Sequence, residues 1–339
     1  MHVRFLDSWT LEIKQGARAR IVRTNKTKEP NTNFSLVRTI HVFSLVEYPN
    51  YTKAMMALAS ELKIHAWGGL GSQLFAVALL NDIQKAWPER KLKIFLHSGG
   101  VTRRIPEVVD LFPEISFNYI DDFSAAKGGS TVGIRNLRAN LSPFLKTFLS
   151  LLNVTLSCDN DASFKNIRFW TRSIRGHYSY RTINHEFLEI FNNRLENACQ
   201  SNESKEGVCA VHYRLGDLLH LENKSPLAPK AVFNELERLS KVSIFSEVEV
   251  FSDSPSRALE LLNPYGRKKM SAPDVDTISV LAHAIQADYF LGSSSKVSFW
   301  IAAVRSEVFS RHSSIPSRNR GEMAGLLNND FMYINLYDV

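Results

Sequence analysis

The chain has 339 residues, of which 44% are hydrophobic and 22% are charged, a composition typical of folded globular proteins and sufficient for two domains. Its formal net charge is +7, and five of the seven excess positive charges lie in residues 1–53. This composition excludes an intrinsically disordered chain, and no apolar run reaches the roughly 18 residues that a membrane-spanning helix needs.

Residues 1–60 form a basic segment that lacks the interleaved aromatic residues and sequence signatures of RNA-binding surfaces. It suits a nucleic-acid arm, a tether to a membrane surface, or a flexible or loosely packed extension. We favour the extension, and we therefore expect no nucleic-acid partner.

Three cysteines, Cys158, Cys199 and Cys209, form neither a CxxC pair nor an even set. This argues against a disulfide framework and against a structural zinc site, and it favours a reducing compartment. The chain also begins without a secretory signal pattern. We therefore expect a cytoplasmic protein that associates with a membrane peripherally at most.

From about residue 60, short apolar runs alternate with longer helical patterns, which is typical of helices layered on largely parallel sheets. A first set predicts strands at 61–67, 91–97 and 115–121, with a helix at 74–87. A second set predicts strands at 207–214, 247–253 and 287–293, with helices at 229–241, 254–263, 275–286 and 295–305. The fold class is therefore α/β, with two Rossmann-like domains at 61–204 and 205–339 that face each other across a cleft.

A glycine-rich turn, Gly68, Gly69 and Gly71, lies between the first strand and its helix. Exposed amides at such a turn receive an anion or approach a sugar closely, although a purely structural tight turn fits equally well. A dinucleotide site is disfavoured, because Leu74 replaces the third glycine and His97 stands where an acidic ribose ligand is expected.

The string "VHYRLGD" ends a buried strand in His212, Arg214 and Asp217. Such groups suit a diphosphate-linked substrate: the planar fork of Arg214 holds phosphate oxygens, His212 binds a phosphate or a hydroxyl, and Asp217 orients the arginine or accepts a proton. The alternative is an ordinary strand exit with solvated charges.

Two further strands end in polar residues. Asp253, after Ser252, suits the paired N–H donors of a guanine edge, and both residues also suit the start of a helix at Pro255. The string "GSSSKVSFW" then places hydroxyl groups before another helix, which predicts a phosphate seat. Three polar strand ends at one edge of a parallel sheet predict a nucleotide crevice.

These motifs stand in the order found in glycosyltransferase family 11, the α-1,2-fucosyltransferases, and residues 62–305 resemble a divergent member of that family. The family string G-G-L-G-N-Q corresponds to residues 68–73, where Ser72 replaces the asparagine. H-x-R-R-G-D corresponds to residues 212–217, where Leu215 replaces the second arginine. N-S-S-F-S-W-W corresponds to Ser294–Trp300, and G-Y-x-Q corresponds to residues 176–179 with His177 and Ser179 substituted.

The resemblance implies a GT-B fold, with an acceptor-side domain at 61–204 and a GDP-sugar domain at 205–339. It implies inverting transfer of fucose from GDP-fucose to a galactose-type hydroxyl of a glycan or lipid-linked oligosaccharide, without a bound metal or cofactor. The residues that it assigns are Arg214, Asp217 and His212 for catalysis; Arg214, Ser252, Asp253, Ser294, Ser295 and Ser298 for the donor; and Gly68, Gly69, Gly71, Gln73 and His177 for the acceptor.

Several alternatives stay open. The linkage or the acceptor differs if the chain is similar to the α-1,6- or protein O-fucosyltransferases, and Leu215 also suits a catalytically silent nucleotide-sugar or glycan-binding protein. The lumen of the Golgi is the expected location if the chain is a truncated eukaryotic member. The catalytic base is open among Asp217, His212, His65, His97 and His177.

Overall fold

The computed structural model describes residues 2–4, 9–14, 18–23, 61–100, 102–123, 152–158, 161–176, 178, 182–199, 205–216, 218, 225–242, 244–263, 269–317 and 333–338. The chain divides into two compact units, Met1–Ser60 and Glu61–Val339. In the first unit, strands β1 (His2–Arg4), β2 (Trp9–Lys14) and β3 (Arg18–Arg23) form an antiparallel sheet in that order. The basic composition of this segment gives no indication of these strands.

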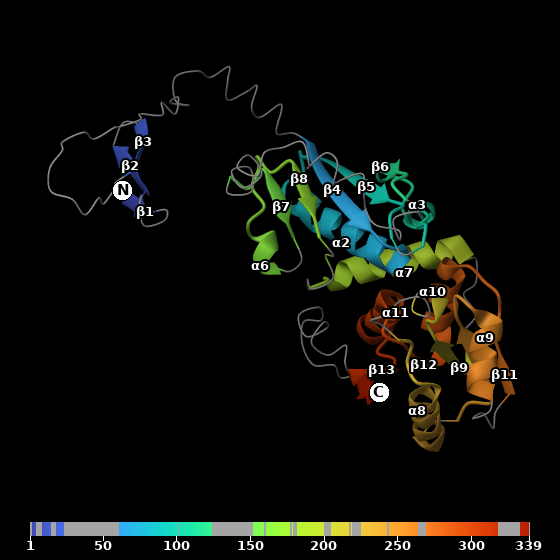
Figure 1. Ribbon diagram of the computed structural model, residues 1–339. Coiled ribbons are helices and arrows are strands. Elements are labelled where there is room, and N and C mark those ends of the chain that lie inside the picture. The colour runs from blue at the N-terminus through green and yellow to red at the C-terminus, as the bar shows by residue number, and fades with distance from the viewer. Residues whose placement is uncertain are drawn as a thin grey trace, which may run out of the picture. The chain divides into compact units, whose positions relative to one another are not determined.

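The second unit begins with a parallel sheet of five strands (Figure 1). The strand order is β6-β5-β4-β8-β7, and every neighbouring pair is parallel. The strands are β4 (Glu61–Trp67), β5 (Lys91–His97), β6 (Phe117–Ile120), β7 (Thr155–Ser157) and β8 (Ser173–Arg175). The helices of this part are α2 (Leu70–Ala86), α3 (Val108–Leu111), α6 (Asp161–Phe164) and α7 (His185–Cys199).

The alternation of buried and exposed residues along β4 gives this sheet two different faces. Leu62, Ile64 and Ala66 are buried in the core on the α2 side. Because successive side chains of a strand point to opposite faces, Lys63, His65 and Trp67 lie on the other face. That second face carries polar and aromatic side chains, and its histidines are taken up below.

The second sheet has six strands in the order β11-β10-β9-β12-β13-β14, again with every neighbouring pair parallel. The strands are β9 (Lys205–His212), β10 (Glu247–Phe251), β11 (Lys269–Ser271), β12 (Ala287–Leu291), β13 (Ser313–Pro316) and β14 (Ile334–Tyr337). The helices are α8 (Pro229–Val242), α9 (Pro255–Leu262), α10 (Thr277–Gln286) and α11 (Lys296–Glu307).

Counted from β9, the order of this sheet is 3-2-1-4-5-6, the order of a Rossmann fold. The order reverses between β9 and β12, so the carboxyl ends of these two strands flank the place where such sheets bind ligands. The predicted α/β class with two Rossmann-like sheets is therefore confirmed.

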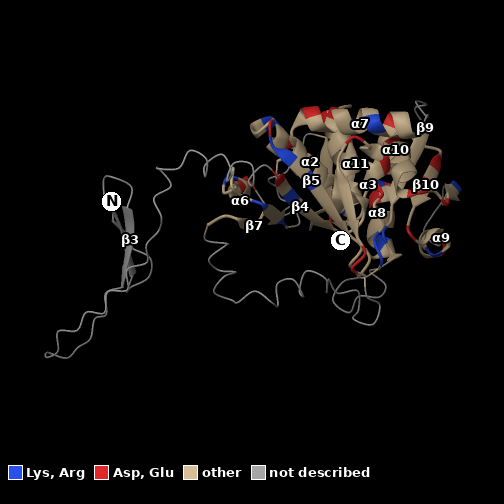
Figure 2. Cartoon of the chain, turned by 90° about the horizontal axis from the view of Figure 1, so that it is seen from above, with Lys and Arg blue, Asp and Glu red and all other residues tan. Residues whose placement is uncertain are grey.

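An aromatic cluster joins the helices of the two sheets within the second unit. Trp300 of α11 is fully buried, and its Nε1–H donates to the carbonyl oxygen of Gly71 in α2 at 2.9 Å. The Phe75 ring lies 4.8 Å from the Trp300 ring and 5.4 Å from the Phe299 ring, centroid to centroid. Helix α7 also packs its apolar side here through Phe187 and Phe191, while its opposite side carries charges of both signs (Figure 2).

Among the described residues, no helix is both long and apolar enough to cross a membrane. The most apolar stretch of the sequence, residues 141–157, lies outside the described residues as far as position 151, and its end forms the short strand β7.

Candidate functional site

Three polar loops follow β9, β10 and β12 at the carboxyl edge of the six-stranded sheet. Since β9 lies between β10 and β12, the loop at 212–216 has the loop at 252–254 on one side and the loop at 292–295 on the other. The structure therefore brings together the strand ends that the sequence singled out, and we call this edge the switch-point site.

Two of these loops are joined through a buried serine of α11. Ser298 Oγ lies 2.7 Å from His212 Nδ1 and accepts the backbone N–H of Ser293 at 2.9 Å. We assign the hydroxyl hydrogen of Ser298 to His212 Nδ1, because the hydroxyl keeps a hydrogen to donate while it accepts the Ser293 N–H. This assignment places the ring hydrogen of His212 on Nε2. Ser298, predicted to contact the donor, is buried and positions His212.

The electrostatics of His212 favour the neutral ring. Burial lowers the pKa of His212 to about 4, with Arg214 acting in the same direction and Asp253 opposing it. At neutral pH the ring is therefore uncharged, and its Nε2–H is a hydrogen-bond donor. This chemistry suits binding of a phosphate or hydroxyl oxygen better than abstraction of a proton.

Arg214 follows His212 and Tyr213 in the same loop. Its backbone N–H donates to Ser293 Oγ at 3.3 Å, so the two switch-point loops are joined a second time. The neighbouring side chains point into the core: Tyr213 donates its hydroxyl hydrogen to Leu227 O at 2.8 Å, and Leu215 is fully buried. Position 215 therefore faces the apolar core behind the loop, where a second arginine would be desolvated.

Asp253 holds the tip of the Arg214 loop. Its Oδ1 accepts the backbone N–H groups of Leu215 at 2.9 Å and Gly216 at 2.8 Å. A Cβ atom at Gly216 would lie 1.9 Å from Asp253 Oδ2, so only glycine fits this approach. Ser252 contributes to the start of α9, since its Oγ accepts the N–H of Ser254 at 3.1 Å.

The loop after β12 leads directly into the N-terminus of α11. Ser295 is the N-cap, and its Oγ accepts the N–H of Val297 at 3.2 Å. Lys296, the first residue of the helix, lies with its Nζ 3.1 Å from Ser72 Oγ and 5.9 Å from the centroid of the Phe75 ring. A helix N-terminus with a cap and a lysine favours negative charge.

The glycine-rich turn of the first sheet meets the start of α11. Gly68 has a φ of +98°, which only glycine adopts readily. A Cβ at Gly71 would lie 2.9 Å from Lys296 C and Val297 N, so the absence of a side chain allows the close approach. The predicted acceptor turn and the predicted phosphate seat are therefore adjacent.

Three hydrogen bonds show that this turn and the first turn of α2 have structural roles. Gln73 is buried, and its amide donates to the carbonyl oxygens of Gly68 at 3.1 Å and Ile105 at 2.7 Å. The first N–H of α2, that of Leu70, donates to Glu107 Oε2 at 3.1 Å, so this helix terminus has a carboxylate partner of its own.

Asp217 and His177 lie outside the described residues, and their predicted roles remain predictions. Among the described residues there is no group of three or more His, Cys, Asp and Glu side chains that could hold a metal ion. Sequence reasoning missed Lys296 as a cation beside the glycine turn, and it missed the contact between His65 and His97. Both involve residues distant in sequence, and the only signal was that His97 ends a strand.

No protein-family model matches the sequence, and no curated protein matches it. Among solved structures, "POFUT1 in complex with GDP" is similar, with 11% identity, coverage of 76% of this chain and 98% of that chain, and a TM-score of 0.39. The E. coli heptosyltransferase WaaC with ADP has 13% identity, coverage of 82% and 93%, and a TM-score of 0.42. The NodZ alpha-1,6-fucosyltransferase soaked with GDP-fucose has 13% identity, coverage of 72% and 92%, and a TM-score of 0.38.

Proposed function

We propose that the chain is an inverting glycosyltransferase of GT-B type that binds a nucleoside-diphosphate sugar at the switch-point site. One observation carries this proposal: the 3-2-1-4-5-6 sheet places Arg214, His212 and the N-terminus of α11 at the edge where its strand order reverses. A guanidinium, a neutral imidazole donor and helix amides together suit a diphosphate.

The roles of the residues follow from this geometry. As the bond from the sugar to the diphosphate breaks, negative charge collects on the phosphate oxygens. Arg214 and the amides at Ser294 and Ser295 stabilise that charge, and His212 donates to it through Nε2. Lys296 adds the positive charge that Leu215 does not supply, because it lies at the start of the same helix.

The proposal also specifies guanine as the base and fucose as the sugar of the donor. The sequence resemblance to family 11 names GDP-fucose as the donor and a galactose-type hydroxyl of a glycan or lipid-linked oligosaccharide as the acceptor. Because Asp253 Oδ1 already accepts two backbone N–H groups, we assign Oδ2 to the guanine edge. Residues 205–339 form the donor domain in this proposal, and residues 61–204 form the acceptor domain.

The proposal is tested by calorimetric titration of the purified full chain with GDP, GDP-fucose, UDP and ADP, with a chelator present throughout. We expect micromolar, guanine-selective binding that Arg214→Ala abolishes. Arg257→Ala is the matched control, because Arg257 is an exposed arginine of α9 whose ion pair within the described part of the chain is with Glu260 on the same helix. Absence of binding, or equal binding of all the diphosphates, would refute the assignment.

A second candidate is a nucleotide-sugar-binding protein without turnover. The buried Leu215 favours it, because the family pattern has an arginine there. Guanine-selective binding without release of GDP from GDP-fucose, with lactose, other glycans or water as acceptor, would favour this candidate over the transferase.

A further inference from the structure

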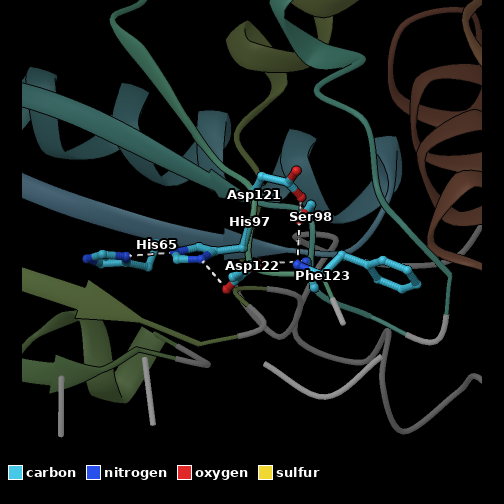
Figure 3. Close-up of polar contacts among 7 residues, drawn as sticks. His65, His97, Ser98, Asp121, Asp122 and Phe123 are labelled. Atoms are coloured by element: carbon cyan, nitrogen blue, oxygen red, sulfur yellow. Dashed lines mark hydrogen bonds and ion pairs between the residues drawn. The ribbon is translucent and has the colours of Figure 1, made fainter. Parts of the chain in front are cut away.

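Three side chains form a continuous hydrogen-bonded chain on the second face of the five-stranded sheet (Figure 3). His65 Nδ1 of β4 lies 3.0 Å from His97 Nε2 of β5. His97 Nδ1 in turn lies 2.9 Å from Asp122 Oδ2, just beyond β6. We call this set the His65 relay, and its members come from β4, β5 and the residues just after β6, 32 and 25 residues apart in sequence.

The inner end of the His65 relay is held in place from several sides. Asp122 Oδ1 accepts the backbone N–H of Gly99 at 2.8 Å, which fixes the carboxylate. Trp67 stacks on His97 with ring centroids 4.4 Å apart and an interplanar angle of 13°. The side chains of His97 and Asp122 are 0% and 4% exposed, respectively, whereas His65 is only partly buried. The relay therefore leads from a buried carboxylate to a partly buried ring.

Hydrogen positions follow from the bonding pattern. The carboxylate of Asp122 accepts, so His97 carries its hydrogen on Nδ1 and presents a lone pair at Nε2. His65 therefore donates from Nδ1 to His97, and its own lone pair lies on Nε2, on the far side of the ring. Figure 3 shows that edge of the His65 ring directed away from His97.

The surroundings keep both rings neutral at rest. Burial, followed by the charges of His97, Arg175 on β8 and Lys63 on β4, lowers the pKa of His65 to about 4. Burial also lowers the pKa of His97, and only there does a carboxylate, Asp122, oppose the shift. A proton that enters at His65 is therefore best accommodated on His97, where Asp122 balances its charge.

The relay lies where the five-stranded sheet is expected to bind a ligand. The order β6-β5-β4-β8-β7 reverses beside β4, and β4 pairs with β8 so that His65 is the neighbour of Arg175. Trp67, two residues nearer the carboxyl end of β4, has a buried Nε1–H with no hydrogen-bond partner among the described residues. An unpaired buried donor near a ring nitrogen that presents a lone pair suits a hydroxyl-bearing ligand.

We propose that His65 is the catalytic base that accepts the proton of the acceptor hydroxyl, and that His97 and Asp122 are positioning residues that receive and balance the charge. This inference rests on the proposed glycosyl transfer. The acceptor oxygen bonds to the anomeric carbon, its proton passes to His65 Nε2, and the bond from that carbon to the diphosphate oxygen breaks with its electron pair leaving on the diphosphate. The Nδ1 hydrogen of His65 passes to His97 Nε2, so an imidazolium faces the Asp122 carboxylate.

The first test measures release of GDP from GDP-fucose in the presence of lactose, together with calorimetric GDP binding. His65→Gln should lower turnover about 100- to 10,000-fold while the Kd for GDP stays unchanged. Asp122→Asn should lower kcat at least about tenfold without raising the KM for GDP-fucose. His185→Gln, an exposed histidine at the start of α7, is the control and should retain full turnover. Wild-type turnover in His65→Gln would refute the assignment of His65 as the catalytic base and leave the proposed function intact.

The second test observes the ring hydrogens of the His65 relay by NMR, without measuring turnover. Long-range ¹H–¹⁵N spectra of the ¹⁵N-histidine-labelled chain should show neutral His65 and His97 rings at pH 7, each with its hydrogen on Nδ1. In Asp122→Asn, His65 and His97 should no longer both keep their hydrogens on Nδ1, and the spectrum of His185 should not change. A wild-type ring with its hydrogen on the other nitrogen would refute the relay. Absence of GDP release by a wild-type chain that binds GDP would instead refute the proposed transfer, and the base with it.

Discussion

Gly216→Ala is the substitution whose effect the geometry of the switch-point site defines best. The three atoms nearest to an added Cβ all belong to the carboxylate group of Asp253: Oδ2 at 1.9 Å, Cγ at 2.5 Å and Oδ1 at 3.2 Å. The carboxylate must therefore move by more than 1 Å to reach ordinary contact, about 3.4 Å or more. That movement breaks its bonds to the N–H groups of Leu215 and Gly216.

The expected magnitude follows from those two bonds. A hydrogen bond to a charged group contributes about 1.5–3 kcal/mol, but the exposure of Asp253 to water reduces this to about 1 kcal/mol for each bond. The free energy of unfolding should therefore fall by about 2 kcal/mol. With an unfolding entropy of about 2.1 cal/mol/K per residue over 339 residues, this lowers Tm by roughly 3 °C. Affinity for GDP should fall at least about tenfold, because the loop that carries Arg214 loses its anchor.

A double-mutant cycle tests the reasoning, with thermal unfolding and calorimetric GDP titration on each variant. Asp253→Ala removes all three clashing atoms together with both hydrogen bonds, so Gly216→Ala should cost little more in that background. Asp253→Asn keeps an acceptor oxygen and serves as the control, with most of the stability retained. If the losses from Gly216→Ala and Asp253→Ala add in full, the clash is not the cause and the reasoning is wrong.

Three further predictions follow. Gly71→Ala should lower the free energy of unfolding by about 1–3 kcal/mol, because the added Cβ meets the backbone of Lys296 at 2.9 Å; an unchanged thermal midpoint would contradict this. Lys296→Met should weaken GDP binding about tenfold in calorimetry, whereas Lys230→Met, on the exposed side of α8, should not. Lowering the pH from about 6.5 to about 4 should reduce the free energy of unfolding, because the unfolded chain protonates His212 at its ordinary pKa while the folded chain does so only near 4; urea titrations should show a smaller decrease for His212→Gln.

The sequence by itself determined the local elements whose patterns are long and regular. The alternation of apolar and polar residues gave the bounds of β4 and β5 correctly, and the helical period located α8, α9 and α10 to within two residues. Most strands of three or four residues, such as β7, β8 and β13, escaped detection because so short a run carries little periodic signal, although β6 lies within the strand predicted at 115–121. The motif around Arg214 was also local, since a buried strand and its polar exit are contiguous in the chain.

Only the tertiary structure decided which polar strand ends meet. Parallel strands are joined by crossovers of a dozen residues or more, so nothing in the sequence near β9 specifies that β12 is its neighbour. That pairing brings Ser293 and Ser298 to His212, and it makes His212 a neutral donor. From the sequence alone, His212 was one of five candidates for the catalytic base.

The same physical reason applies to the glycines and to the His65 relay. The need for glycine at position 71 arises from the approach of α11, more than 220 residues later, and the need at position 216 arises from Asp253 on another strand. In the sequence, His65 and His97 are two separate histidines, each on its own predicted strand. They form one chain with Asp122 because parallel register places β4, β5 and β6 side by side, and burial strengthens the hydrogen bonds between them.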